Sequence, residues 1–283
     1  MAFLLYLFGS GLAFWLGIGL VLAGFFGRIR SKEHCADRLS VYTVDFGLVL
    51  VVLSAVPLPY LVYAAAIGCT VLWLVGEKSP RTWWQRRRYA LRGCVVGAWL
   101  LAVMWEAPYQ ITPRVISRTG QVYVIGDSIS AGLGGEAVPW PELLAESRNW
   151  QVHSYAGAGA TTSQALLQAE RLPDEAELVI VEIGGNDMLS GKPVADFERD
   201  LDALLSLVRQ KGQQVVMFEL PLPLLFNEYG RVQRSLAARH DVRLAPKRLL
   251  MGVLATGNAT EDSVHLTQSG HQRLAEVVSG MIE

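Results

Sequence analysis

The chain has 283 residues, of which 51% are hydrophobic, and its 25 Lys and Arg nearly balance its 26 Asp and Glu, for a formal net charge of −1. A chain with so little net charge has no general electrostatic attraction to nucleic acid or another polyanion. The average hides two compositions, because the chain is mostly apolar before about Tyr109 and carries charges throughout after Gly120. We therefore predict a transmembrane helical domain over residues 1–110, a linker over 111–119 and a second domain over 120–283.

Four stretches of the apolar part are predicted to cross a membrane. Residues 2–26 contain no charged side chain, and this stretch is long enough for one helix to cross about 30 Å of hydrocarbon. A secretory signal would begin with basic residues, whereas here no basic residue precedes Arg28. Residues 41–56 and 60–75 are expected to form a helical hairpin that turns at Pro57-Leu58-Pro59, with one long kinked helix as the alternative. Residues 93–105, extended by apolar neighbours, form the fourth span, and counts of three and four both stay open.

Basic residues gather in the two segments between these spans. The positive-inside rule puts both segments in the cytoplasm. With four spans, the N-terminus and the second domain then lie outside the cytoplasm. An odd number of spans would put the second domain on the other side of the membrane unless the N-terminus moved too. The run RTWWQRRRYALR mixes basic and aromatic residues as nucleic-acid patches do, but its position between two apolar spans favours the membrane surface. The basic residues are Arg28, Arg30, Lys32 and Arg38, and Lys78, Arg81, Arg86, Arg87, Arg88 and Arg92.

The second domain alternates strand and helix signals. Its central strands are nearly continuously apolar, as buried parallel strands are. Such alternation predicts a three-layer α/β/α domain with a parallel sheet, whose ligands sit at the carboxyl ends of the strands. The predicted strands are residues 121–125, 151–155, 178–183, 214–218 and 242–244, and the predicted helices are 140–146, 162–171, 194–211, 228–240 and 269–282.

Four polar motifs occur in this domain, in the order GDSIS, AGAGATT, GGND and DSVH. Ser128 of the first motif follows the first predicted strand, where a serine most often caps a helix. The next two motifs follow the second and third strands, and the last lies near the C-terminus. Each motif alone has an ordinary structural explanation, such as a glycine-rich helix start or a turn. All four in this order are not expected by chance.

Together the motifs resemble the four blocks of the SGNH (GDSL) hydrolase family, and VPWPELL, VEIGGNDMLSG and FELPLP resemble its small bacterial periplasmic thioesterase, lysophospholipase and arylesterase group. The resemblance covers the chain from about Val122 onward and none of the apolar half. It implies a flavodoxin-like SGNH hydrolase domain. Gly159, rather than Gly157, is taken as the glycine of the second block because it directly precedes Ala-Thr-Thr. His265 is followed by Leu266-Thr267, where the family commonly has a proline.

The residues themselves suggest the chemistry. A serine hydroxyl needs a base to act as a nucleophile at neutral pH, and His265 is the candidate base for Ser128. Asp262 can bond the other imidazole nitrogen and stabilise the imidazolium. The expected oxyanion hole consists of the backbone N–H groups of Ser128 and Gly159 and the side-chain amide of Asn186.

Other polar residues are assigned structural roles. His153 and His240 are expected to make satisfied structural contacts, and His271 is expected to face solvent. Asp127 and Asp187 are expected to shape their loops by bonding nearby backbone groups and are left out of the catalytic set.

No metal or other cofactor is expected. Cys35, Cys69 and Cys94 all lie in the apolar half, so the second domain has no disulfide and no zinc–thiolate site. No HExxH zinc motif and no GxxxxGK[ST] phosphate loop occurs either. A mechanism through Ser128 needs neither.

These observations predict a multi-pass protein of the bacterial inner (cytoplasmic) membrane, with a catalytic domain facing the periplasm or cell exterior. It is expected to hydrolyse acyl esters of lipids or envelope components, with membrane lipids and the acyl-ester substrate as partners and no nucleic acid. Apolar residues of the loops 133–139 and 222–228 are expected to set the acyl-chain length. An acyltransferase with the same triad and a non-enzymatic membrane binding module are the alternatives.

Overall fold

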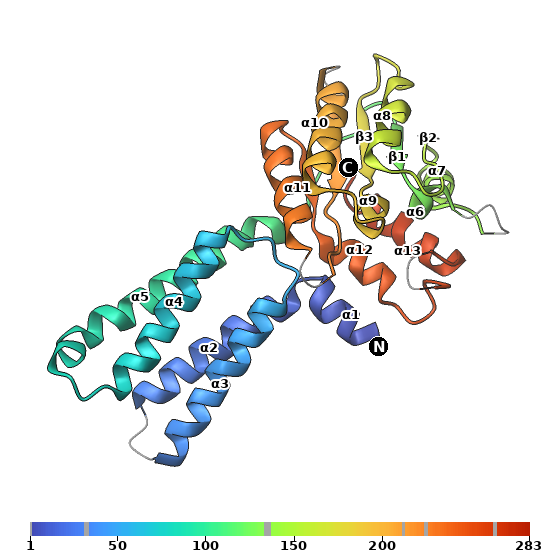
Figure 1. The fold of residues 1–283 in the computed structure, drawn as a ribbon. Coiled ribbons are helices and arrows are strands. Elements are labelled where there is room, and N and C mark those ends of the chain that lie inside the picture. Colours follow the sequence, from blue (N-terminus) through green and yellow to red (C-terminus); the bar gives the residue numbers. More distant parts are fainter. Residues whose placement is uncertain (1, 31–33, 133–136, 211–212, 224–225, 263–264) are drawn as a thin grey trace. The chain divides into compact units, whose positions relative to one another are not determined.

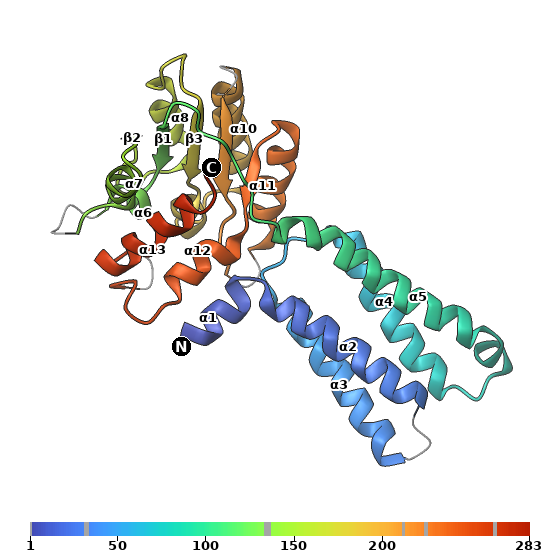
Figure 2. The same cartoon turned by 180° about the vertical axis from the view of Figure 1, so that it is seen from behind.

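The computed structural model describes residues 2–283 except 31–33, 133–136, 211–212, 224–225 and 263–264. Its contacts divide the chain into two units. The helical unit is Gly11–Pro108, and the α/β unit is Met1–Ser10 together with Tyr109–Glu283. Figure 1 and, from behind, Figure 2 show the elements of both.

The helical unit consists of α2 (Leu12–Arg30), α3 (His34–Leu53), α4 (Tyr60–Lys78) and α5 (Thr82–Glu106). α2 packs along α3 and α4 along α5 (Figure 1). The first pair meets at glycines, because a Cβ on Gly17 would lie 2.7 Å from the carbonyl oxygen of Gly47, and one on Gly47 equally close to that of Gly17. Such close approach at small residues is common between membrane helices.

Three helices of the described chain are long and apolar enough to cross a membrane: Leu12–Arg30, Tyr60–Glu77 and Thr82–Gln110. The prolines predicted to form a turn lie between α3 and α4, so the alternative of one long kinked helix is wrong. α3 covers the second predicted span but is not among the three, and the four-span topology stays a prediction.

The first predicted span differs from the structure, because residues 2–26 are not one helix. α1 (Ala2–Gly9) ends before Ser10, and α2 begins at Leu12. The Ser10 hydroxyl bonds back to the Tyr6 carbonyl, and Gly11 has a φ of 83°, in the left-handed region where a helix cannot continue. The apolar helix long enough to span therefore starts at Leu12, and α1 belongs to the α/β unit rather than to a domain over 1–110.

The α/β unit contains the predicted parallel sheet of five strands, in the order β2-β1-β3-β4-β5. All neighbouring strands pair in parallel, and the register aligns Val122 with Leu178 and Val152. All five predicted strands are confirmed to within two residues at either end. They are β1 (Gln121–Gly126), β2 (Gln151–Ser154), β3 (Leu178–Glu182), β4 (Gln214–Phe218) and β5 (Arg243–Ala245).

Helices cover both faces of this sheet, as predicted (Figures 1 and 2). α7 (Trp140–Arg148), α12 (Lys247–Leu254) and α13 (Gln268–Ser279) share a core with the side chains of Val122, Ile180 and Val216. The other face is covered by α8 (Thr162–Glu170), α10 (Val194–Gln210) and α11 (Asn227–Arg239). The short α6 (Ser128–Ala131) and α9 (Gly185–Leu189), and α12, were not predicted.

The residues predicted as a linker are bound into the α/β unit. The N–H of Val115 donates to the carbonyl of Met281 at 2.9 Å, and the N–H of Glu283 donates to the carbonyl of Val115 at 2.8 Å. The Val115 and Ile282 side chains are 1% and 2% exposed. After η1 (Ala107–Gln110), Arg248 also bonds the Thr112 hydroxyl at 2.9 Å. Residues 111–119 are therefore part of the folded unit.

Candidate active site

The predicted motifs lie where the strand order reverses. The chain leaves β1 toward β2 on one side and later returns to form β3 on the other side of β1. In open parallel sheets, ligands bind beyond the carboxyl ends of the strands at such a switch point. GDSIS follows β1, AGAGATT follows β2 and GGND follows β3, so three of the four motifs meet at this edge.

The loop after β1 presents Ser128 at the start of α6. Ser128 is not the helix cap, since the carboxylate of Asp127 accepts the N–H of Ile129 at 2.9 Å and takes that role. Gly126 is required by space, because a Cβ there would lie 2.7 Å from the Ser130 hydroxyl oxygen. The capping explanation for Ser128 is thus wrong, and its hydroxyl is available for another function.

Asn186 connects the ends of the strands. Its side-chain Nδ2 donates to Asp127 Oδ2 at 3.2 Å and to the carbonyl oxygen of Ala160 at 3.0 Å, so both amide hydrogens are used in this state. Gly159, just before Ala160, has a φ of 71°, a conformation that favours glycine. The structure therefore brings Asn186 and the Gly159 loop together, with Asp127 between Asn186 and the serine loop.

Asp187 ties the second motif to the third. Its fully buried carboxylate accepts the N–H of Thr162 at 2.8 Å and the Thr162 hydroxyl at 2.7 Å. Lys192 Nζ lies 2.8 Å from the same carboxylate and 2.6 Å from that of Asp200. We expected Asp187 to bond backbone close to it in sequence. Its partner Thr162 instead begins α8, so Asp187 fixes the position of the Gly159 loop.

His265 and Asp262 form the predicted pair. His265 Nδ1 lies 2.6 Å from Asp262 Oδ2, and the His265 N–H donates to Asp262 Oδ1 at 2.9 Å. Nε2 is then the ring nitrogen that can take a proton from a nucleophile. Within the described residues no hydrogen bond joins His265 to the Ser128 hydroxyl. His265 lies close enough to Asp127, the chain neighbour of Ser128, for the two side chains to interact electrostatically.

Two buried carboxyl groups lie close to the Ser128 loop. Glu182, the last residue of β3, is 2% exposed and accepts the Ser130 hydroxyl at 3.0 Å, and Asp127 is 3% exposed. Burial raises the pKa of Glu182 well above its ordinary value, and the charge of Asp127 raises it further. Burial also raises the pKa of Asp127, to about 6. Burial therefore favours the protonated form of Glu182, which can donate a hydrogen bond to the Asp127 carboxylate.

The proton on Glu182 predicts how stability depends on pH. Since its pKa is higher in the folded than in the unfolded chain, the stabilisation from this proton is complete below the ordinary value of 4.5 and is lost as pH rises through the folded pKa. Glu182→Gln carries an amide in place of the protonated acid and removes this dependence. We expect its melting temperature to match the wild type near about pH 5 and to exceed it near about pH 8.

The control is Glu198→Gln, at an exposed position of α10. It should leave the difference between the melting temperatures at the two pH values unchanged. If Glu182→Gln and wild type lose stability equally between them, Glu182 is ionised in the folded protein and the carboxyl pair is assigned wrongly.

The other three histidines of the α/β unit make contacts of their own. His271 was expected to face solvent, which is wrong: it is 1% exposed and its Nδ1 accepts the backbone N–H of Trp140 at 3.3 Å. Burial lowers its pKa and favours the neutral form that such a bond needs. His153 stacks on Tyr123 and His240 bonds Asp202 at 2.7 Å, as structural roles predict.

Among the described residues no group of three His, Cys, Asp or Glu side chains is placed to hold a metal ion. The loops predicted to set acyl-chain length are described in part. Residues 133–136 and 224–225 lie outside the described residues, whereas Leu222 and Pro223 line a cavity considered below.

Comparison with known proteins agrees with this geometry. A profile described as the GDSL-like Lipase/Acylhydrolase family matches residues 124–273. The chain is 30% identical to "Esterase TesA" of Pseudomonas aeruginosa over 182 residues, 59% of this chain and 89% of that protein. It is 25% identical to "Thioesterase 1/protease 1/lysophospholipase L1" of Escherichia coli K12 over 63% of this chain and 92% of that protein. A crystal structure of TesA superposes with a TM-score of 0.51 and 28% identity, covering 57% of this chain and 97% of that one.

Proposed function

Because the chain belongs to the GDSL-like Lipase/Acylhydrolase family, we propose that it is a membrane-anchored serine esterase that uses Ser128, His265 and Asp262 to hydrolyse acyl esters through an acyl-enzyme. The observation that carries this proposal is the His265–Asp262 pair, with 2.6 Å between Nδ1 and Oδ2, in the same unit as Ser128 at the end of β1. A hydrogen bond of this kind orients the imidazole so that Nε2 serves as the base.

In the proposed reaction, the Ser128 oxygen attacks the ester carbonyl while His265 Nε2 takes the hydroxyl proton. The imidazolium, stabilised by Asp262, returns that proton to the leaving alcohol, and water then hydrolyses the acyl-enzyme by the same route. Catalytic hydrogen bonds are often long or unformed without substrate, so the Ser128–His265 bond is expected to form in the substrate complex.

The oxyanion requires a donor that is not already fully used. The N–H groups of Ser128 and Gly159 are proposed as two donors and the amide of Asn186 as the third. Of the two bonds that Asn186 makes, the one to Asp127 is the longer, at 3.2 Å against 3.0 Å. We propose that the amide hydrogen bonded to Asp127 is donated to the oxyanion during the reaction instead, while the bond to Ala160 holds the amide in place.

Asn186→Ala tests this role. Loss of one oxyanion donor typically lowers kcat by about 10²- to 10³-fold, and we expect a loss of that size with KM changed little, since the donor acts mainly on the transition state. Steady-state kinetics with a p-nitrophenyl ester measures both. A variant with unchanged kcat removes Asn186 from the oxyanion hole.

A membrane anchor is proposed from the helical unit. Its helices leave large apolar side chains exposed, such as Leu61 at 83% and Met104 at 70%, and contiguous exposed apolar surface needs lipid or a partner to cover it. Substrates at the membrane, such as lysophospholipids or acylated envelope components, fit this location. The inner membrane and a catalytic unit on its outer side follow from the charge pattern and are proposed on that basis.

The test of the proposed function is covalent labelling. A fluorophosphonate probe reacts with an activated serine, and peptide mass spectrometry of the detergent-purified full chain should find the adduct on Ser128. Products formed from an ester with an added alcohol acceptor then separate a hydrolase, which releases the free acid, from an acyltransferase, which forms a new ester. An absence of adduct on Ser128 overturns the proposal in favour of a binding module.

A further inference from the structure

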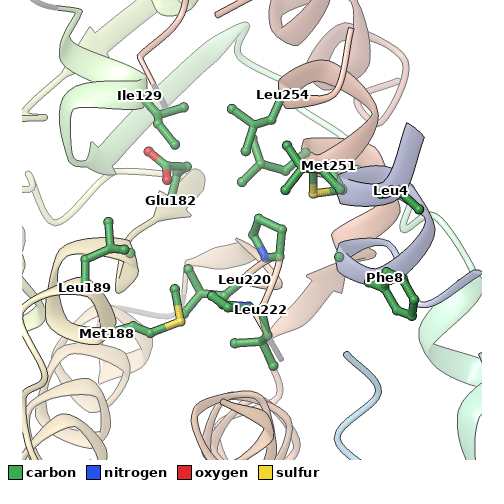
Figure 3. A pocket seen from close by; sticks show the side chains of 16 residues that line it. Leu4, Phe8, Ile129, Glu182, Met188, Leu189, Leu220, Leu222, Met251 and Leu254 are labelled. Atoms are coloured by element: carbon green, nitrogen blue, oxygen red, sulfur yellow. The ribbon is translucent and has the colours of Figure 1, made fainter. Parts of the chain in front are cut away.

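An apolar cavity of about 670 Å³ lies inside the α/β unit (Figure 3). Its wall begins at the catalytic edge with Ile129 and Gly185, the direct neighbours of Ser128 and Asn186 in the chain. It continues past Leu220 and Leu222 to Met251 of α12. A cavity of this size lined mainly by hydrophobic side chains is typical of a site for an apolar ligand.

The far wall of the cavity comes from the N-terminal helix α1. Leu4 and Phe8 line it from one side, opposite Met188 and Leu189 of α9 (Figure 3). α1 lies against α12: a Cβ on Gly9 would lie 2.6 Å from the sulfur of Met251, and one on Gly252 would lie 3.9 Å from the Tyr6 ring. Gly9 therefore allows α1 to approach α12 closely.

The polar groups of the cavity also fit an apolar ligand. Glu182 is the titratable residue among its lining side chains, and burial raises its pKa, which favours its uncharged form at the cavity wall. Ser128 and Asn186 directly precede and follow lining residues Ile129 and Gly185 in the chain, so their hydrogen-bonding groups lie next to that end of the cavity. This arrangement suits a ligand with one polar carbonyl group and a long hydrocarbon tail.

We propose that α1 forms one wall of an acyl-chain site, so that the preferred substrate is a long-chain fatty-acyl ester whose tail lies between α1, α9 and α12 with its carbonyl at Ser128. This inference rests on the proposed function and names its substrate class. Each methylene buried in such a site improves binding by about fourfold, so kcat/KM rises with chain length until the cavity is filled.

The first test narrows the cavity from the α1 side. In Leu4→Trp the larger ring takes up part of the cavity, and we expect kcat/KM for p-nitrophenyl dodecanoate to fall by about tenfold or more while that for p-nitrophenyl butyrate stays within about twofold. The matched control is Phe3→Trp on the same helix, where the side chain is 68% exposed and does not line the cavity. It should leave the ratio of the two esters unchanged.

The second test fixes α1 in place. In the full chain with Cys35, Cys69 and Cys94 replaced by serine, G9C and M251C are expected to form a disulfide, because the Cβ position at Gly9 lies 3.3 Å from Met251 Cγ. Thiols that stay reduced under oxidising conditions overturn the docking of α1.

The outcomes separate this inference from the proposed function. A wild type that hydrolyses neither ester overturns both. A wild type that hydrolyses the esters, with a dodecanoate-to-butyrate ratio that Leu4→Trp changes no more than Phe3→Trp does, overturns only the role of α1.

Discussion

Ser128→Ala is expected to lower kcat/KM for p-nitrophenyl butyrate by on the order of 10⁴- to 10⁶-fold, the largest effect that any single substitution in this chain should have. The alanine cannot form the acyl-enzyme, so only the remaining oxyanion donors and binding contribute. Ser128 is 7% exposed and the cap of α6 is Asp127, so the substitution removes no helix cap and the fold should be kept.

Ser130→Ala is the matched control within the same helix. Its hydroxyl bonds Glu182 at 3.0 Å and accepts the Trp140 indole N–H at 3.2 Å, so it supports the site without being the proposed nucleophile. Loss of such bonds costs about 1 to 3 kcal/mol of stability, and activity should fall by less than tenfold. Equal activity of Ser128→Ala and wild type would show that another group attacks the ester.

Asp187→Ala is expected to destabilise the α/β unit by about 3 to 5 kcal/mol. The buried carboxylate holds the backbone and hydroxyl of Thr162 and one side of Lys192, so its removal leaves buried donors without their acceptor. The Gly159 loop then loses one of its attachments to the segment after β3, while the bond from Asn186 to the Ala160 carbonyl remains. Thermal unfolding should shift down by about 10 °C, and the activity that survives should be reduced.

Asp196→Ala measures what an exposed ion pair contributes on a neighbouring helix. Asp196 pairs with Arg199 at 2.6 Å, but the two side chains are 42% and 67% exposed, so water and salt screen the pair and its loss should shift thermal unfolding little. If both aspartates gave shifts of the same small size, the buried network around Asp187 would be a minor contributor, and Asp187 would not be the residue that holds the loop.

The α/β fold could be predicted because its signals are local. The three central strands β1, β3 and β4 are short, mainly apolar runs, and the helix of residues 194–210 has one clear apolar stripe, so the alternation that defines a parallel sheet is visible along the chain. α12 was not predicted because only Pro246 separates it from β5 and its eight residues are too few to show a clear helical period.

The first membrane span was misjudged for a related reason. The mean hydropathy stays high throughout residues 2–26, and Ser10 and Gly11 are both tolerated in apolar helices, so the sequence predicts one continuous helix. In the structure the chain turns at Gly11, which has a φ of 83°, and Gly9 of α1 packs on Met251. The contact with Met251 joins regions far apart in the chain, which periodicity cannot reveal.

The candidate catalytic residues could be chosen from motif order, but their supporting contacts could not. The carboxyl groups of Asp127 and Glu182 and the bond between Asp187 and Thr162 join residues far apart in the sequence. Glu182 had a weak signal, a charged residue inside the apolar run LVIVEI. An acid at the end of a buried strand is costly unless it is partnered, and that alone marks the position as a candidate for a functional role.

The pairing of Val115 with the residues around Ile282 determines where the catalytic part of the protein can be cut. Both partners lie outside residues 124–273, which the family profile matches. A fragment trimmed to that match would lack both partners, the first residues of β1 and the end of α13, and would expose the core residues that Val115 and Ile282 pack against. Biochemical dissection should therefore start no later than Tyr109 and keep Glu283, and even such a fragment will lack α1.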